Sequence, residues 1–401
     1  MQRYKVTITP QSPLCFSESR PGGQFRDSLP YIPGTALRAA VAERMLAGTS
    51  GAFADLFTGP QPAIFSNAYP AEYVLPATAM SCKANPGFMG GERQRHGVID
   101  TLVEQVCFET LRPAGLLYLP HCRECGSRLE HYSCFYRFDG TKAQRVSVPQ
   151  RLLTRVAINR RRGTAEEGLL YSPIVVAEGV RRPERNWEFE PTTFTGFAAC
   201  DKHGNTLKKC LGEVDFLGSG TTRGLGRVKV EALEQSSSTD ADLDKRCQEL
   251  NERITTFSET LQKLPCSQNP THSSDQGSYF TLDLYADAIL KEDGWLPTMV
   301  LTAEMLKARC GIRDDTLQLV RAYSGYDYRG GWNLAWGLPK DVEVVVPRGS
   351  VFVYWTKSLD EWRSALQDLE FRGIGERPAE GFGQVRVCDE FHTIASRGRR
   401  V

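Results

Sequence analysis

Two cysteines at close spacing, Cys122 and Cys125, form the most specific metal-binding motif of the sequence. Gly126 follows them, and a Cys-x-x-Cys turn with an adjacent glycine lets the backbone fold around a tetrahedral ion. The alternative interpretation is a pair of ordinary reduced thiols. A redox role is disfavoured, because no thioredoxin-like βαβ context surrounds the motif. We therefore predict a structural zinc site.

A structural zinc ion needs four ligands, so two more must come from elsewhere in the chain. Candidates in the surrounding region are Cys82, His96, Cys107, His121, His131 and Cys134. Cys82 and His96 lie in polar stretches next to glycines, and we predict them as the remaining ligands. Residues 102–111 have an apolar helical pattern, which favours a core position for Cys107. The fourth ligand stays open among His96, Cys107 and Cys134. Such a site is closed and leaves no position for catalysis.

A glycine-rich stretch with arginines, residues 216–230, reads FLGSGTTRGLGRVKV. Glycine permits positive φ and close approach of a partner, while exposed N–H groups and arginines bind phosphates. A related stretch at residues 373–387 repeats two glycine pairs around an arginine and also precedes a strand. The predicted RNA-binding residues in the two loops are Gly218, Gly220, Thr222, Arg223, Gly224, Gly226 and Arg227, then Gly375, Arg377, Gly381 and Gly383.

Two common glycine-loop functions do not fit. A dinucleotide fingerprint needs its glycines between a strand and a helix, and a P-loop needs Gly-Lys-Ser/Thr before a helix. Here a strand follows both loops. A single loop of this kind would favour a mobile surface loop or a bulged hairpin. The duplication, with arginine in both copies, favours a binding element instead.

Further basic groups accompany these loops. Gly34 and Thr35 open a predicted helix that carries Arg38, and a helix N-terminus is an anion site. Arg26 lies in the polar segment before that helix. Three consecutive arginines, Arg160, Arg161 and Arg162, stand beside Gly163 and suit a phosphate backbone. The alternative for these three is a solvated hairpin tip.

The composition narrows the class of protein. The chain has 401 residues and a net charge of +1, so any nucleic-acid footprint must be local. No apolar run is long enough to span a membrane, and the N-terminus enters a strand with no signal-peptide pattern. Twelve cysteines without a secretion signal indicate reduced thiols and a metal site. We expect a cytoplasmic protein without membrane contact.

Hydrophobic periodicity divides the chain into two α+β units. Alternating residues predict strands near 4–9, 189–199 and 279–286, and a hairpin formed by 342–346 and 351–355. Helical patterns cover residues 37–46, 102–111, 206–216 and 359–369. A stripe at residues 243–264 predicts a connecting helix. The expected boundaries are 1–235 for the first domain, with a zinc-binding insertion near 78–140, 236–278 for the linker and 279–401 for the second domain.

The opening strand, the Ile32-Pro33-Gly34-Thr35-Ala36-Leu37-Arg38 segment and the two glycine loops resemble the RAMP superfamily of CRISPR-associated proteins. The cysteine insertion, the arginine run and the two-unit layout resemble more closely the Csx-type subunit of type III-D effector complexes. The resemblance covers nearly the whole chain. It implies two ferredoxin-like (RRM-like, βαββαβ) domains in tandem, each with a glycine loop before its last strand that contacts guide RNA. Glu376 and Glu380 in the second loop depart from that pattern.

The function implied by the resemblance is a non-catalytic, crRNA-binding subunit. It would cap the 5′ handle of the crRNA, contact the large polymerase-like subunit and the backbone RAMP subunit, and meet target RNA only indirectly. The alternative is a RAMP endoribonuclease that processes precursor crRNA or cleaves target RNA. Processing would need a histidine acid or base such as His203 or His392. Target cleavage would need an acidic residue such as Asp27.

Overall fold

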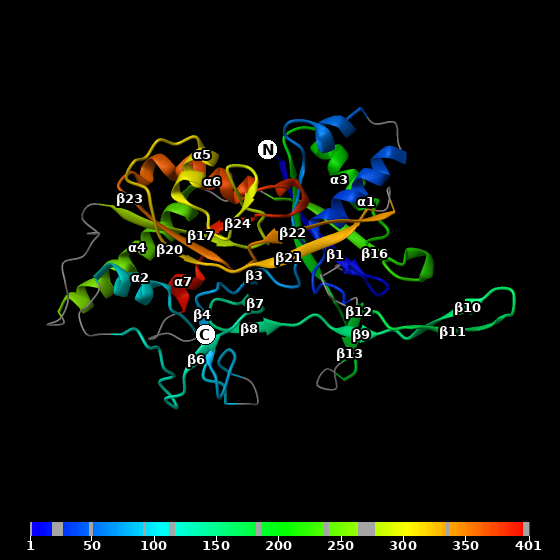
Figure 1. Ribbon diagram of the computed structural model, residues 1–401, viewed down its shortest axis with the longest axis horizontal. Coiled ribbons are helices and arrows are strands. Elements are labelled where there is room, and N and C mark those ends of the chain that lie inside the picture. The colour runs from blue at the N-terminus through cyan, green and yellow to red at the C-terminus, as the bar shows by residue number, and fades with distance from the viewer. Residues whose placement is uncertain are drawn as a thin grey trace.

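The computed structural model describes residues 2–17, 27–47, 51–90, 94–111, 117–181, 186–235, 240–263, 277–333, 337–395 and 401. Within these ranges the chain forms two four-stranded antiparallel sheets, several small sheets and the helices that cover them (Figure 1). The prediction of a mixed α and β chain with antiparallel sheets is confirmed. In the described part of the chain, no helix is both long and apolar enough to cross a membrane.

The first unit follows the order strand, helix, strand, strand, helix, strand. Its sheet has the order β16-β1-β15-β2, so the first and third strands lie at the centre. Tyr4, Val6 and Ile8 point into one apolar core because alternate residues of a strand share a face. The elements are β1 (Gln2–Pro10), α1 (Gly34–Ala47), β2 (Ile64–Phe65), β15 (Phe194–Cys200), α3 (Gly204–Gly212) and β16 (Val228–Gln235), with the short η1 (Ala54–Thr58) and η3 (Thr221–Arg223).

The second unit repeats this order, and its sheet reads β20-β23-β17-β24. Trp362 of its second helix and Phe280 of its first strand are fully buried in a separate core. The elements are β17 (Ser278–Leu284), β18 (Lys291–Glu292), β19 (Leu296–Pro297), α5 (Ala303–Cys310), β20 (Gln318–Tyr323), β21 (Asp327–Asn333), β22 (Leu338–Val345), β23 (Val351–Thr356), α6 (Leu359–Arg372), η5 (Pro378–Glu380), β24 (Val385–Val387) and α7 (Phe391–Ile394).

A long segment between β2 and β15 carries small sheets and one helix. It comprises β3 (Tyr73–Val74), β4 (Ala79–Cys82), β5 (Val98–Asp100), α2 (Leu102–Leu111), β6 (Leu129–His131), β7 (Phe135–Phe138), β8 (Ala143–Val146), β9 (Gln150–Leu152), β10 (Arg155–Asn159), β11 (Thr164–Tyr171), β12 (Ile174–Val176), β13 (Gly179–Arg181) and β14 (Phe189–Pro191). Helix α2 packs against the connecting helix α4 (Asp240–Gln262), and both belong to the core of the second unit. Helix α2 of the inserted segment is thus docked on the second unit.

Two sequence predictions need correction. The predicted hairpin of residues 342–346 and 351–355 is wrong, since β22 pairs with β21 while β23 pairs with β17 and β20. The intervening turn docks on the insertion instead, where the N–H of Ala77 donates to the carbonyl of Gly349 at 2.6 Å. The helix expected at 206–216 ends earlier, at Gly212.

Candidate metal centre and nucleic-acid interface

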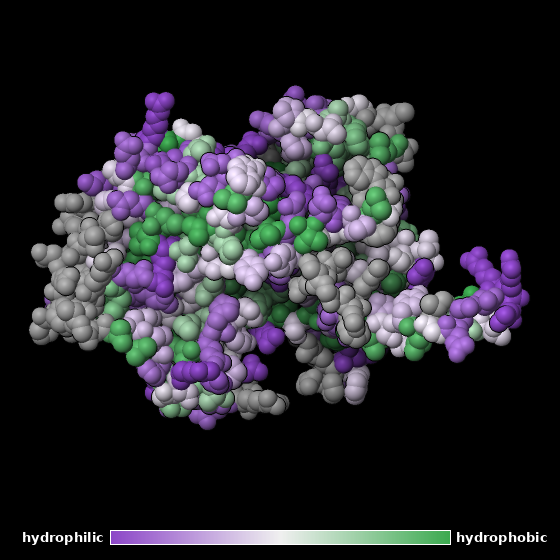
Figure 2. Space-filling model, viewed as in Figure 1, coloured by the Kyte–Doolittle hydropathy of each residue, from purple (hydrophilic) through white to green (hydrophobic). Residues whose placement is uncertain are grey.

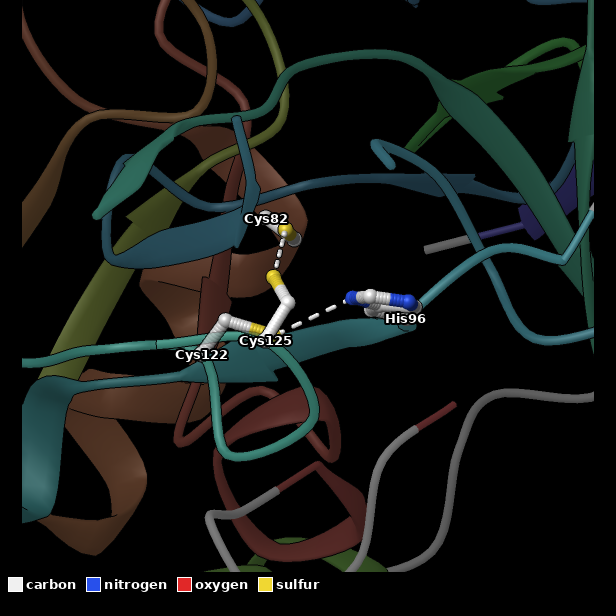
Figure 3. A group of neighbouring side chains, drawn as sticks. All are labelled: Cys82, His96, Cys122 and Cys125. Carbon is white, nitrogen blue, oxygen red and sulfur yellow. Dashed lines mark hydrogen bonds between the residues drawn. The ribbon is translucent and has the colours of Figure 1, made fainter. Parts of the chain in front are cut away.

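Four predicted ligands meet at one point of the insertion. The ligand atoms of Cys82, His96, Cys122 and Cys125 all lie within 4.8 Å of one another (Figure 3). The sulfurs of Cys82 and Cys125 are 3.5 Å apart, and Nδ1 of His96 lies 3.3 Å from the sulfur of Cys122. Ligands about 2.3 Å from a tetrahedral ion are separated by just under 4 Å. The cluster therefore fits zinc in ligand type, number and spacing.

Strand pairing explains why residues so far apart in sequence come together. Strand β4 lies between β5 and β6, and Cys82 at its end pairs with Leu129 just beyond the cysteine turn. The turn itself closes through Gly126, whose N–H donates to the carbonyl of Cys122 at 2.8 Å and whose φ is +70°. Strand β5 begins two residues after His96 and brings that ring to the same end of the sheet.

The electrostatics around Cys125 favour a thiolate. The side chain and backbone of Ser127 form hydrogen bonds with its sulfur and lower the pKa of Cys125 to about 6. Burial raises the pKa of Cys82 instead. A cation bound between them would be the counter-charge that deprotonated thiols need, because metal ligation requires the thiolate form.

The alternative fourth ligands lie elsewhere. The thiol of Cys107 is buried in the α2–α4 contact and donates to the carbonyl of Ile254 at 3.6 Å. Cys134 does not belong to the cluster, and burial raises its pKa to about 12. His121 is exposed and lies 2.7 Å from the carbonyl of Leu119. The structure thus brings together His96 with the three cysteines.

The first glycine loop is a compact surface element. Gly218, Gly220, Gly224 and Gly226 all have positive φ, between +78° and +87°. A Cβ at Gly226 would lie 2.6 Å from the carbonyl of Leu217, so glycine is required there for packing. Leu225 is buried beneath the loop, whereas Thr222, Arg223 and Arg227 are exposed.

Most backbone N–H groups of this loop are already used within the protein. The N–H of Ser219 donates to the carbonyl of Cys15, that of Gly226 to Pro13, and that of Arg227 to the hydroxyl of Ser12. Only a few backbone N–H groups of the loop are therefore left for the phosphate cradle that the sequence predicted. The side chains at the top of the loop remain available, and arginine is the strongest phosphate donor among them.

The three arginines 160–162 form the tip of the β10–β11 hairpin, which projects from the body (Figure 1). Asn159 shapes the tip by accepting hydrogen bonds from the N–H groups of Arg161 and Arg162 at 3.0 and 3.1 Å. Figure 2 shows the projecting end covered by hydrophilic residues. The three arginines thus lie at a hairpin tip, which was the alternative interpretation of this run; their contact with RNA stays a prediction.

The base of the hairpin joins the first glycine loop. Nη2 of Arg155 donates to the carbonyl of Arg223 at 3.1 Å, and Nη1 of Arg223 donates to the hydroxyl of Tyr171 at 3.2 Å. Arg155 and Tyr171 are directly opposite each other in the hairpin. Sequence reasoning did not select Arg155 as a site residue. The sequence did contain a signal for Arg155, because this residue begins an alternating strand that leads to three arginines.

The second glycine loop has a different environment. Its short helix η5 packs against α1 and β2 of the first unit. Arg377 is ion-paired with Glu380 at 2.6 Å and stacks on the ring of Phe382. Gly375, Gly381 and Gly383 have positive φ, and Cβ atoms at these positions would collide with the carbonyls of Ile289, Phe65 and Ile374 or with Asn67. The glycines here permit close packing between chain segments.

Gly34 and Thr35 lie at the same contact between the second glycine loop and the first unit, which we call the seam. The side chain of Asn67 accepts from the N–H of Gly34 at 2.8 Å and donates to the carbonyl of Gly381 at 3.1 Å. A cavity of about 190 Å³ opens beside this contact and is lined by Thr35 and Arg377 among others. Its wall includes four carboxylates and three basic side chains, namely Asp287, Asp341, Glu343, Glu380, Arg329, Lys340 and Arg377. Because carboxylates outnumber basic side chains in this wall, the cavity disfavours a bound phosphate.

The remaining predicted residues are placed as follows. Arg38 donates to the carbonyl of Phe57 at 2.8 Å and stacks on its ring. Arg26 lies outside the described residues. Phe16 links the two surfaces, because it lines the seam cavity and would contact a Cβ at Gly218. Sequence patterns gave no reason to select Phe16 or Asn67.

The residues considered for nuclease chemistry are dispersed. His203 is at a helix start and lies 2.9 Å from Asp55. His392 is fully buried between Asp100 and Asp283, with nitrogen–oxygen distances of 3.0 and 2.7 Å. Asp27 is exposed and bridges to Ile174. Among the described residues, no histidine lies beside the first glycine loop.

Comparison with known proteins gives distant similarities only. No family model matches the chain, and neither does any curated protein. A chain of the type III-B Cmr-beta complex bound to cognate target RNA and AMPPnP is 12% identical, with 93% of this chain and 90% of that chain covered and a TM-score of 0.39. A chain of the same complex bound to cognate target RNA is 11% identical, with the same coverage and a TM-score of 0.37. A chain of a type IV-B CRISPR complex is 12% identical, with 59% and 92% covered and a TM-score of 0.25.

Proposed function

We propose that this protein is a non-catalytic crRNA-binding subunit of a type III CRISPR effector complex, built from two ferredoxin-like RAMP domains in tandem. The order strand, helix, strand, strand, helix, strand in each unit, with the first and third strands central, supports that domain type. The proposed role is to cap the 5′ handle of the crRNA. The Csx-type, type III-D assignment rests on the sequence resemblance.

One observation carries the proposal, and it concerns the ion pairing of the exposed arginines in the first glycine loop and at the hairpin tip. Within the described part of the chain, no carboxylate is ion-paired with Arg160, Arg161, Arg162, Arg223 or Arg227. By contrast, Arg377 in the corresponding position of the second loop is neutralised by Glu380. Unpaired arginines on a joined loop and hairpin suit an RNA backbone, because binding there releases counterions without first breaking ion pairs.

This difference assigns separate roles to the two glycine loops. The first loop and the hairpin base, through Arg155, Arg223 and Tyr171, offer donors and one aromatic ring for a single strand. The second loop holds the two units together through Gly381 and Asn67. Any RNA contact by Gly375, Arg377, Gly381 or Gly383 would be made from the edge of the seam cavity.

Zinc is proposed as a structural cofactor. Cys82, His96, Cys122 and Cys125 would fill all four tetrahedral positions and would stabilise a small sheet, β5-β4-β6. The expected partners are the crRNA, the large polymerase-like subunit and the backbone RAMP subunit, with target RNA contacted indirectly.

An endoribonuclease is the alternative function. Metal-free RNA cleavage needs an acid and a base within reach of the ribose and the leaving oxygen. His392 is fully buried and both ring nitrogens are engaged, so it cannot reach RNA in this structure. The exposed His203 lies 2.9 Å from Asp55, at the end of α3 opposite to the one that leads into the first glycine loop. These placements favour binding without cleavage.

The test is purification without added RNA, followed by denaturing gel analysis and mapping of the 5′ ends of any bound nucleic acid. A discrete RNA species with one common 5′ end supports the capping role. Labelled repeat RNA is then incubated with the protein in EDTA. Bound, intact RNA agrees with the proposal, whereas a single cut would establish the nuclease. Absence of RNA in both experiments would argue against an autonomous RNA-binding subunit.

A further inference from the structure

A short hairpin of the second unit presents a tryptophan to solvent. Strands β18 and β19 pair as Lys291 with Pro297 and Glu292 with Leu296, and the turn between them has positive φ at Asp293 (+50°) and Gly294 (+79°). The side chain of Trp295 at this turn is 72% exposed. Leu296 and Met299 nearby are 45% and 42% exposed. Exposed large apolar side chains that gather at one turn and are rimmed by polar residues mark an interaction site.

The hairpin that carries Trp295 forms one wall of a groove of about 510 Å³, through residues 291–294, and α5 forms the other. Its floor is apolar and rigid, since Leu290, Leu301, Leu306 and Ile374 are nearly inaccessible core residues. Met305 adds a half-buried, adaptable side chain. The N–H of Thr298 donates to the carbonyl of Leu290 at 3.1 Å and holds the hairpin over the core.

The rim of the groove is acidic. Four carboxylates line it, those of Glu292, Asp293, Glu304 and Glu376, against two basic groups, Lys291 and Arg309. Lys291 is already paired with Glu376 at 2.8 Å and Glu304 with Lys307 at 3.5 Å, and Nη2 of Arg309 donates to the carbonyl of Gly373 at 3.2 Å. Glu292 and Asp293 form no ion pair within the described residues and remain exposed.

We infer that this surface, Trp295 with the acidic groove, is a docking site for a protein segment that carries an apolar face flanked by lysine or arginine. An exposed tryptophan could also stack on a nucleic-acid base. The acidic rim decides between a protein partner and a nucleic acid. Phosphates would be repelled by the carboxylates, whereas cationic side chains would complement them. A central tryptophan surrounded by polar residues is the usual composition of a protein–protein hot spot. This inference does not depend on the proposed RNA-binding role of the first unit.

The experiment uses the full-length protein and three probes. The first is an amphipathic helical peptide of about 15 residues made of leucine and lysine, long enough to form a helix. The second is the same peptide with glutamate replacing lysine, and the third is oligouridylate RNA. Tryptophan fluorescence and calorimetry should show binding of the lysine peptide alone. W295A should weaken it at least about tenfold, as truncation of a hot-spot residue does.

Two sets of variants keep the inference falsifiable. E292Q combined with D293N should weaken binding of the lysine peptide and reduce its salt dependence, because these two carboxylates form no ion pair within the described residues. W187A is the matched control, since Trp187 is 60% exposed on the first unit and should leave binding unchanged. Equal binding by wild type and W295A would overturn the inference. It would also be overturned by preference for the glutamate peptide, by W295A-sensitive binding of oligouridylate, or by no binding of the lysine peptide.

Discussion

The guanidinium of Arg155 donates a hydrogen bond to the backbone carbonyl of Arg223 at 3.1 Å, although 68 residues separate them in sequence. This contact fixes the base of the β10–β11 hairpin on the tip of the first glycine loop. Arg223 in turn reaches the hydroxyl of Tyr171 across the hairpin. The two arginines therefore belong to one surface element, and any strand that crosses the loop also meets the hairpin.

We expect R223A combined with R227A to weaken single-stranded RNA binding and to flatten its salt dependence. Loss of two phosphate contacts should reduce the slope of log Kd against log salt by about 1.4, at about 0.7 per contact. Fluorescence anisotropy over a series of salt concentrations measures this. R377A is the matched control, because its guanidinium is already paired with Glu380. An unchanged slope in the double variant would remove the first loop from the RNA site.

The sequence predicted individual strands, helices and turns better than the long-range contacts that those elements make. Alternation at Tyr4, Val6 and Ile8 marks β1, because a half-buried strand must alternate. The paired cysteines Cys122 and Cys125 marked the Cys/His cluster that could hold a metal, because ligand spacing is a local property. Cys82 and His96 were found from residue type and context, and strand pairing brought them to the site.

Other features depend on contacts that no local pattern contains. The two glycine loops have similar sequences, yet the second packs against Asn67 and Phe65 of the first unit. Residues 347–350 have the composition of a hairpin turn, but the strands on either side enter different sheets. A turn composition specifies a change of direction and leaves the pairing of the next strand to long-range packing.

Removal of one cysteine ligand should abolish metal binding and loosen the insertion. C122S would leave three ligands, and a structural zinc site contributes directly to folding. Metal analysis should fall from about one zinc per chain to a small fraction of that, and hydrogen exchange should rise in β4, β5 and β6. C134S is the control, because that thiol is close in sequence and outside the cluster. Retained zinc in C122S, or zinc lost in C134S, would contradict the ligand assignment.

Stability should depend on the protonation of His392. Burial alone would lower the pKa of His392, but the charges of Asp283 and Asp100 and the hydrogen bonds to them outweigh it and raise the pKa well above its usual range. A raised pKa means that the stabilisation is complete below about pH 6.5, the unfolded value, and is lost as pH rises through the folded value. The buried Asp389 lies close by, and burial and Asp283 raise its pKa.

H392Q tests this relationship. Removal of one partner of a buried ion pair costs about 3–5 kcal/mol, and urea unfolding at pH 6 should show a loss of that order. The difference between wild type and H392Q should shrink as pH is raised, because the wild-type histidine then loses its charge. Asp100 and Asp283 contact His392, the buried Asp389 lies close by, and all three are present in both proteins. A difference that is constant with pH would mean that His392 is neutral in the folded protein.

The seam between the two units should be sensitive to one methyl group at Gly34. A Cβ at this position would lie 2.1 Å from the carbonyl of Phe65 and 2.8 Å from that of Glu380, so G34A must push the second glycine loop away from α1. Overpacking of this kind costs about 1–3 kcal/mol, and thermal unfolding should show it. Gly212 at the end of α3 is the matched control, because a Cβ there meets nothing within 4 Å. G212A should be neutral or more stable by up to about 1 kcal/mol, since alanine favours the helix. If G34A is as stable as G212A, the two units are not held together by this contact, and the second loop would be free to bind RNA.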